Sequence, residues 1–165
     1  MEHGAHNATL CLDNPFWRYS LQQYAVSGCS DFLLLAQDKH RLNINAVLYL
    51  GWLAHSGKVF EPSVLDQALL FSEQVIEPLR LARKAAKKEG NVNLYEHIKK
   101  SELMAEQHMQ AMLYGNSLTL EDVDSNFMSS IQLLENALEA HLPQALNNDQ
   151  SWKAALIRYL HIKID

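Results

Sequence analysis

Apolar positions follow helical spacing through most of the chain and fall into eight stretches separated by prolines, glycines and asparagines. The expected helices cover about residues 15–25, 31–40, 44–54, 62–74, 77–88, 91–114, 117–142 and 150–162. No stretch of useful length alternates apolar and polar residues as a half-exposed strand does, and no internal repeat is visible. The pattern predicts an all-α fold, a single-domain bundle of seven or eight helices.

One stretch, residues 44–54, is apolar almost all round: INAVLYLGWLA. A helix without a polar face is buried on several sides, so we expect this one at the centre of the bundle. It spans 11 residues, whereas a membrane-crossing helix needs about 20. The sequence therefore predicts a buried central helix and no membrane segment.

Turn residues set the expected helix ends. Ser30 is a candidate cap for the second helix, and Gly115 is a candidate stop for the helix that begins near residue 91. Pro78 lies inside an otherwise continuous helical pattern. Because proline removes one backbone hydrogen bond and clashes with the preceding turn, we expect a kink or a break near residues 75–77.

Composition adds limits on the class of protein. The chain has 165 residues, of which 48% are apolar and 20% charged, which suits one globular domain. A net charge of -5 disfavours nucleic acid as a partner. The two cysteines, Cys11 and Cys29, do not make a disulfide framework, and the first 14 residues lack the basic start and apolar run of a signal peptide. We therefore expect reduced thiols and a cytoplasmic protein.

The decapeptide SELMAEQHMQ, residues 101–110, holds the most suggestive chemistry. Helical spacing places Glu102 within an apolar stripe, where a carboxylate needs a partner. The preceding helix supplies Arg80 and Arg83, and a turn at Gly90 would fold the two helices into a hairpin. We favour a structural Glu102–arginine pair; acid–base catalysis by Asp38 and Glu102 remains an alternative.

A metal site is not expected in this segment. Di-iron bundles use Glu-x-x-His spacing, whereas Glu106 and His108 are two residues apart. That spacing points the two side chains about 200° apart around the helix. The sequence predicts no metal and no cofactor.

Other polar and aromatic residues have both structural and functional interpretations. Gln37 and Asp38 are suited to capping the amides of the turn at residues 41–45. Trp17, Tyr49 and Trp52 are expected in the core, with an aromatic wall for an apolar ligand as the alternative. The candidate polar cluster comprises Gln37, Asp38, Asn45, Arg80, Arg83, Glu102 and Glu106.

Charge is distributed in blocks. Residues 80–88 hold five basic side chains, while residues 116–149 hold six acidic side chains and no lysine or arginine. Such blocks are usually solvated faces, but complementary patches also steer protein partners. The sequence is therefore consistent with a protein partner and specifies no oligomeric state.

Four segments carry a family resemblance: NPFW at residues 14–17, LLLAQDKHRLNINAVLYLGWLA at 33–54, VIEPLRLARKAAKK at 75–88 and SELMAEQ at 101–107. Together they resemble a family of small proteobacterial proteins of unknown function. Arg41 stands where members often have glycine, and Ala36 replaces a common leucine. The resemblance implies a cytoplasmic helical domain and brings no activity with it.

The expected organisation is a flexible segment at residues 1–13, a family-like helical core at 14–115 and C-terminal helices packed on it at 116–165. The favoured function is a non-catalytic, cytosolic interaction or regulatory domain. The alternative is a small enzyme or ligand-binding protein. Its pocket would be lined by Asp38, Arg80, Arg83, Glu102 and Trp52.

Overall fold

A computed structural model describes residues 10–161, so most of the predicted flexible segment at residues 1–13 lies outside the described residues. The helices are α1 (Pro15–Ala25), α2 (Cys29–His40), α3 (Ile44–His55), α4 (Asp66–Phe71), α5 (Glu77–Lys88), α6 (Val92–Ser117), α7 (Ser130–His141), α8 (Gln144–Asn147) and α9 (Gln150–Leu160). A short 3-10 helix (Pro62–Leu65) precedes α4. Apart from one isolated bridge, every regular element between residues 10 and 161 is helical, which confirms the all-α class.

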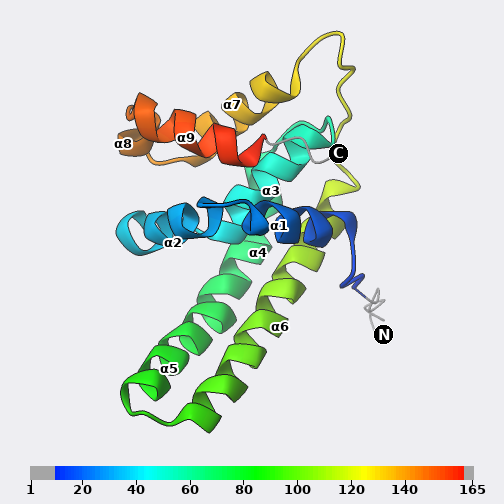
Figure 1. Cartoon of the computed structure of the whole chain (residues 1–165). Helices are drawn as coiled ribbons and strands as arrows, with labels where there is room; N and C mark the ends of the chain where they lie inside the picture. Colours follow the sequence, from blue (N-terminus) through cyan, green and yellow to red (C-terminus); the bar gives the residue numbers. More distant parts are fainter. Residues whose placement is uncertain (1–9, 162–165) are drawn as a thin grey trace, which may run out of the picture.

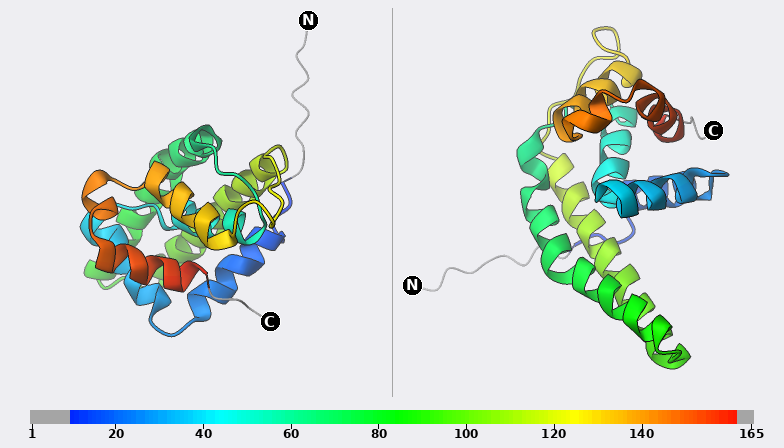
Figure 2. Two further views of the ribbon diagram at one scale, coloured as in Figure 1. Left: turned by 90° about the horizontal axis from the view of Figure 1, so that it is seen from above. Right: turned by 90° about the vertical axis from the view of Figure 1, so that its left-hand side faces the viewer.

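The helices form three groups around α3. Helices α7–α9 cover one end, α1 and α2 lie across the middle, and α5 and α6 extend away from the body as a long antiparallel hairpin (Figure 1). Figure 2 shows from a second direction that the hairpin reaches beyond the other helices. Because α3 contacts α1, α2, α6, α7 and α9, it joins all three groups.

Helix α3 is the centre of the core, as its apolar sequence predicted. Every residue from Asn45 to Ala54 is buried. Gly51 permits close packing here, since a Cβ at this position would collide with the hydroxyl of Tyr19 and press against Leu160. The same hydroxyl donates a hydrogen bond to the carbonyl of Leu160, 2.7 Å away. A side chain at Gly51 would therefore separate α3 from both α1 and α9.

Of the kink or break expected near residues 75–77, the break is wrong, because the chain stays helical from α4 through Pro78. A π-helical turn (Ser72–Ile76) joins α4 to α5 without interruption. In this turn the amide of Glu77 donates to the carbonyl of Ser72, five residues back, so the hydrogen-bond register shifts just before the proline. The wider turn accommodates Pro78. Asn43, the residue that caps the start of α3, also contacts this turn: its Nδ2 donates a hydrogen bond to Ser72 Oγ, 2.9 Å away.

The segment at residues 118–129 also differs from the prediction, because it is not part of a helix. Helix α6 continues through Gly115 to Ser117, and α7 begins only at Ser130, where Ser129 and Gln132 form a reciprocal capping box. Between them the chain pairs with the turn after α3, with Val59 N to Glu121 O at 3.0 Å. Asp124 accepts from the amide of Asn126, a side-chain contact that competes with helix formation.

Three smaller expectations concern the start of α2, membrane insertion and the cysteines. Helix α2 starts at Cys29, with Gly28 at φ 83° as its cap in place of Ser30. Although α6 has 26 residues, no helix within residues 10–161 is both long and apolar enough to cross a bilayer. Cys11 and Cys29 are unpaired thiols, as expected.

Candidate functional site

The predicted ion pair between the hairpin helices is present and has two arginines. Arg80 Nε lies 3.2 Å from Glu102 Oε1, and Arg83 Nη2 donates to the same oxygen at 3.4 Å. Arg83 Nε also binds Glu102 Oε2. The Glu102 side chain is only 9% exposed, so its charge is compensated almost entirely by these two guanidinium groups.

Glu106 extends the ion pair by one helical turn. Arg80 Nη2 lies 3.2 Å from Glu106 Oε1, so this arginine bridges both carboxylates. Burial raises the pKa of the Glu106 carboxyl, with the opposing attraction of Arg80 as the next largest influence and repulsion from Glu102 adding to the rise. Hydrogen bonding to Glu102 holds the pKa of Arg83 above its ordinary value. The Glu106 carboxyl therefore protonates more readily than an ordinary glutamate.

These charged residues form one wall of a cavity of about 420 Å³. The other walls come from α1, α2 and the start of α3, so the cavity lies where the hairpin meets the body of the fold. Six of the seven residues in the candidate polar cluster line it: Gln37, Asn45, Arg80, Arg83, Glu102 and Glu106. The sequence had grouped them without showing a cavity.

Apolar and aromatic side chains line much of the remaining surface. Helix α1 contributes Trp17, Leu21 and Tyr24, which lie on one face at helical spacing, and Leu48 of α3 and Leu103 of α6 lie in the lining as well. Burial, followed by the charge of Glu106, raises the pKa of Tyr24 to about 12. Tyr24 therefore keeps its proton at neutral pH and presents an uncharged ring and hydroxyl.

The buried part of the cavity contains polar atoms without protein partners. Ser20 is 4% exposed and Gln110 is 2% exposed. Gln110 Nε2 donates to Asn45 Oδ1 at 2.7 Å, but Gln110 Oε1 and Ser20 Oγ make no hydrogen bond within residues 10–161. Both atoms belong to residues of the lining, and a buried polar atom without a partner is rare in a folded protein.

The opposite end of the cavity is open and basic. Leu103, which follows Lys99 by one turn of α6, is 54% exposed, which places part of the lining at the surface. Lys99 lies in the same lining, and no carboxylate among residues 10–161 forms an ion pair with it. Arg80 and Arg83 are already paired with Glu102 and Glu106, so Lys99, whose Nζ lies over the Tyr95 ring 5.8 Å from its centroid, leaves the lining with one positive charge in excess.

Two residues of the predicted pocket lie elsewhere. Asp38 is exposed and reaches Lys84 of α5 at 3.7 Å instead of entering the cavity. Trp52 is 6% exposed in the core, with its ring centroid 5.6 Å from that of Phe16. The expected capping by Gln37 and Asp38 is replaced by Asn43, which accepts from the amide of Ala46. Acid–base chemistry between Asp38 and Glu102 has no support in this arrangement.

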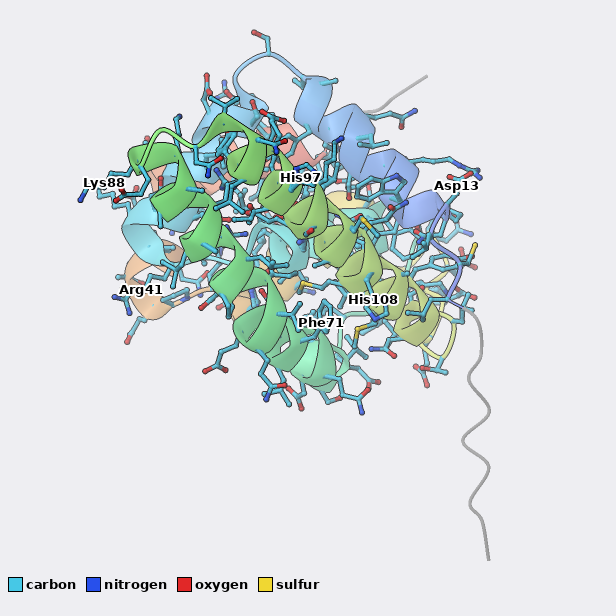
Figure 3. The ribbon with its side chains drawn as sticks, turned by 90° about the horizontal axis from the view of Figure 1, so that it is seen from below. Asp13, Arg41, Phe71, Lys88, His97 and His108 are labelled. Atoms are coloured by element: carbon cyan, nitrogen blue, oxygen red, sulfur yellow. The ribbon has the colours of Figure 1, made fainter. Side chains whose placement is uncertain are left out.

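His108 is separated from the carboxylates, as its spacing predicted. Its ring packs on Phe71 of α4 with centroids 4.9 Å apart, and Figure 3 shows the two side chains together between α4 and α6. In the part of the chain that the structure describes, no three His, Cys, Asp or Glu side chains gather closely enough to hold a metal ion.

The sequence interpretation missed Ser20, Lys99 and Gln110. It expected Trp17 in the core, with an aromatic wall of a ligand pocket as the alternative, and Trp17 is half-buried in the cavity lining. A signal was present on α6, where lining residues recur at helical intervals: Lys99, Glu102, Leu103, Glu106 and Gln110. This stripe, polar except for Leu103, runs along α6 beside the apolar stripe that drew attention to Glu102. The stripe by itself does not indicate which other helix lies opposite it.

Comparison with known proteins gives a family without an assigned activity. The family described as "Protein of unknown function (DUF2390)" matches residues 15–113, and all lining residues from Trp17 to Gln110 fall within that range. No curated protein and no solved structure matches the chain significantly. The resemblance to a family of unknown function is confirmed, while its proteobacterial origin stays a prediction. The chain belongs to the DUF2390 family of proteins of unknown function.

Proposed function

We propose that this protein binds a small amphipathic organic molecule in the cavity between the α5–α6 hairpin and helices α1–α3. The observation that carries the proposal is the combination of apolar walls with two buried polar atoms of the lining residues, Ser20 Oγ and Gln110 Oε1, that find no hydrogen-bond partner in the described part of the chain. Of the two functions that the sequence left open, this is the ligand-binding alternative. An interaction or regulatory role is compatible with it, because a bound ligand can change how a helical domain meets a partner.

The size and composition of the cavity support a small organic ligand. Ligand sites typically enclose about 300 to 1,000 Å³ and combine apolar walls with a few polar groups that fix orientation. The cavity here measures about 420 Å³. Its aromatic residues, Trp17 and Tyr24, offer rigid apolar surface at little entropic cost.

The ion pairs in the wall have a positioning role in this proposal. Glu102 binds arginines from one helix of the hairpin while lying on the other, so it fixes the two helices at a set separation. Both guanidinium groups are already engaged, and neither contributes an unpaired charge. The wall therefore presents a rigid, nearly neutral polar surface to the ligand.

A fluorescent amphipath tests the proposal directly. Anilinonaphthalene sulfonate should bind one molecule per chain in a saturable titration of the native protein. Leu103→Trp places a larger side chain in the cavity lining, whereas Met104→Trp, on the neighbouring residue, changes an exposed side chain outside it. We expect the first substitution to weaken binding by about tenfold or more and the second to leave it unchanged.

Two results would contradict the proposal. One is the absence of saturable binding by the folded wild-type protein, verified by its cooperative thermal transition. The other is equal binding by the Leu103→Trp and Met104→Trp variants, which would place the dye on an unrelated surface.

A further inference from the structure

The cavity has a chemical direction along α6. The lining residues of this helix run from Lys99 to Gln110, 11 positions apart, which corresponds to about 16 Å along the helix axis. Lys99 is exposed, whereas Gln110 is 2% exposed. The open and closed ends of the cavity therefore carry different polar groups.

The closed end requires a hydrogen-bond donor. The side-chain nitrogen of Gln110 is used by Asn45 at 2.7 Å, so its free atom is the carbonyl oxygen, which only accepts. Ser20 Oγ, also free, can accept or donate. A hydroxyl or amino group on the ligand satisfies Gln110, whereas an aliphatic end leaves a buried acceptor unpaired.

The open end requires an acid group. Among the lining residues, three side chains are cationic and two are carboxylates, and the carboxylates are taken by Arg80 and Arg83. Lys99 is the lining cation for which residues 10–161 offer no carboxylate partner. A ligand carboxylate at this end would balance that charge where solvent still reaches it.

The middle of the cavity requires apolar surface. Leu21 and Trp17 of α1 and Leu48 of α3 lie in the lining, and the residues that these two helices contribute to the lining are all uncharged. A saturated or aromatic chain buries apolar area against these side chains, and this burial supplies most of the binding free energy.

From this arrangement we infer that the ligand is an elongated organic acid whose far end carries a hydroxyl or amino group. Its acid group lies at Lys99, its apolar chain lies against α1 and α3, and its terminal donor binds Gln110 and Ser20. The inference rests on the proposed function, because it names the class of molecule that the same cavity binds.

A set of matched aliphatic probes tests the class on the wild-type protein. The probes are ω-hydroxydecanoate, decanoate, which lacks the hydroxyl, and decanediol, which lacks the acid. Each is measured by displacement of anilinonaphthalene sulfonate. We expect ω-hydroxydecanoate to bind about tenfold more tightly than decanoate, because decanoate leaves Gln110 Oε1 unpaired, and about threefold more tightly than decanediol.

Two substitutions test which end of the ligand lies at Lys99 and which lies at Gln110. Gln110→Leu should weaken ω-hydroxydecanoate by about tenfold and change decanoate by less than about twofold, because decanoate has no hydroxyl to lose. Lys99→Gln should weaken both acids by about threefold and leave decanediol unchanged. Lys100→Gln is the matched control, since Lys100 is an exposed neighbour outside the lining.

The inferred ligand class is wrong if the wild-type protein binds decanoate and ω-hydroxydecanoate equally, or if Gln110→Leu weakens both equally. In either case, one dye molecule per chain with sensitivity to Leu103→Trp still supports the proposed function. Loss of dye binding altogether overturns both. If Gln110→Leu does not fold, the wild-type probe comparison and the Ser20→Ala variant decide the question.

Discussion

Replacing Glu102 by alanine should destabilise the domain more than any other change to its charged residues. Glu102 is 7% exposed and binds both Arg80 and Arg83. Its removal leaves two guanidinium groups, with side chains 19% and 23% exposed, next to an apolar cavity. Breaking one partner of a buried ion pair typically costs about 3 to 5 kcal/mol.

The structure places the expected value at the lower end of that range. Arg80 keeps its contact with Glu106 at 3.2 Å, and both arginines retain some access to solvent. We therefore expect Glu102→Ala to lower the free energy of unfolding by about 3 kcal/mol. Glu106→Ala should cost less than about 1 kcal/mol, because that side chain is 30% exposed and binds one arginine.

The assay is urea unfolding followed by circular dichroism, with each variant compared with the wild type. Glu96→Ala on the exposed face of α6 is the control, because Glu96 forms no ion pair with residues 10–161. A double-mutant cycle with Arg83→Ala isolates the pair itself. If Glu102→Ala and Glu96→Ala differ by less than about 0.5 kcal/mol, the ion pair does not hold the hairpin together.

Three further predictions test other parts of the fold. Trp52→Ala should cost about 3 to 5 kcal/mol in urea unfolding, because Trp52 is 6% exposed among aromatic core residues; a loss below about 1 kcal/mol would contradict its place in the core. Arg41→Gly should raise the free energy of unfolding by about 0.5 to 1 kcal/mol, because Arg41 is exposed and has φ 54°, a conformation that glycine adopts without strain; a lower melting temperature would contradict this. Burial raises the pKa of Glu106, so the folded state holds this proton more tightly than the unfolded chain does, and the stabilisation that this group contributes should be lost as the pH rises through the raised pKa, above the ordinary range of a glutamate. Glu106→Gln should lack that loss, and identical pH profiles in urea unfolding would refute the assignment.

Arg41 illustrates how a sequence departure acquires a physical meaning. It stands where the resembling family often has glycine, and the structure places it at the left-handed end of α2. Figure 3 shows its side chain at the edge of the molecule. The position demands a backbone conformation and not a particular side chain, which explains why glycine suits it.

The sequence by itself determined the class of fold, the central helix and the ion pair in the hairpin. These features depend on short-range patterns: helical periodicity, an apolar segment without a polar face, and opposite charges on two helices joined by a turn at Gly90. It also located the disturbance near Pro78, although a π-helical turn replaces the expected break. Residues 118–129 were misjudged because helical spacing outweighed the local hydrogen bonding of Asp124.

Only the tertiary structure decided that the cavity exists and which residues line it. Its walls combine Trp17 and Ser20 of α1 with Lys99 and Gln110 of α6, about ninety positions apart in the sequence. Periodicity shows which face of a helix is apolar or polar, but not which other helix will cover that face or leave a gap beside it. That Ser20 and Gln110 each have a side-chain oxygen without a partner in residues 10–161 follows only from the packing of α1, α3 and α6. A missing hydrogen bond depends on which neighbours surround a residue in the folded protein, and not on the residue alone.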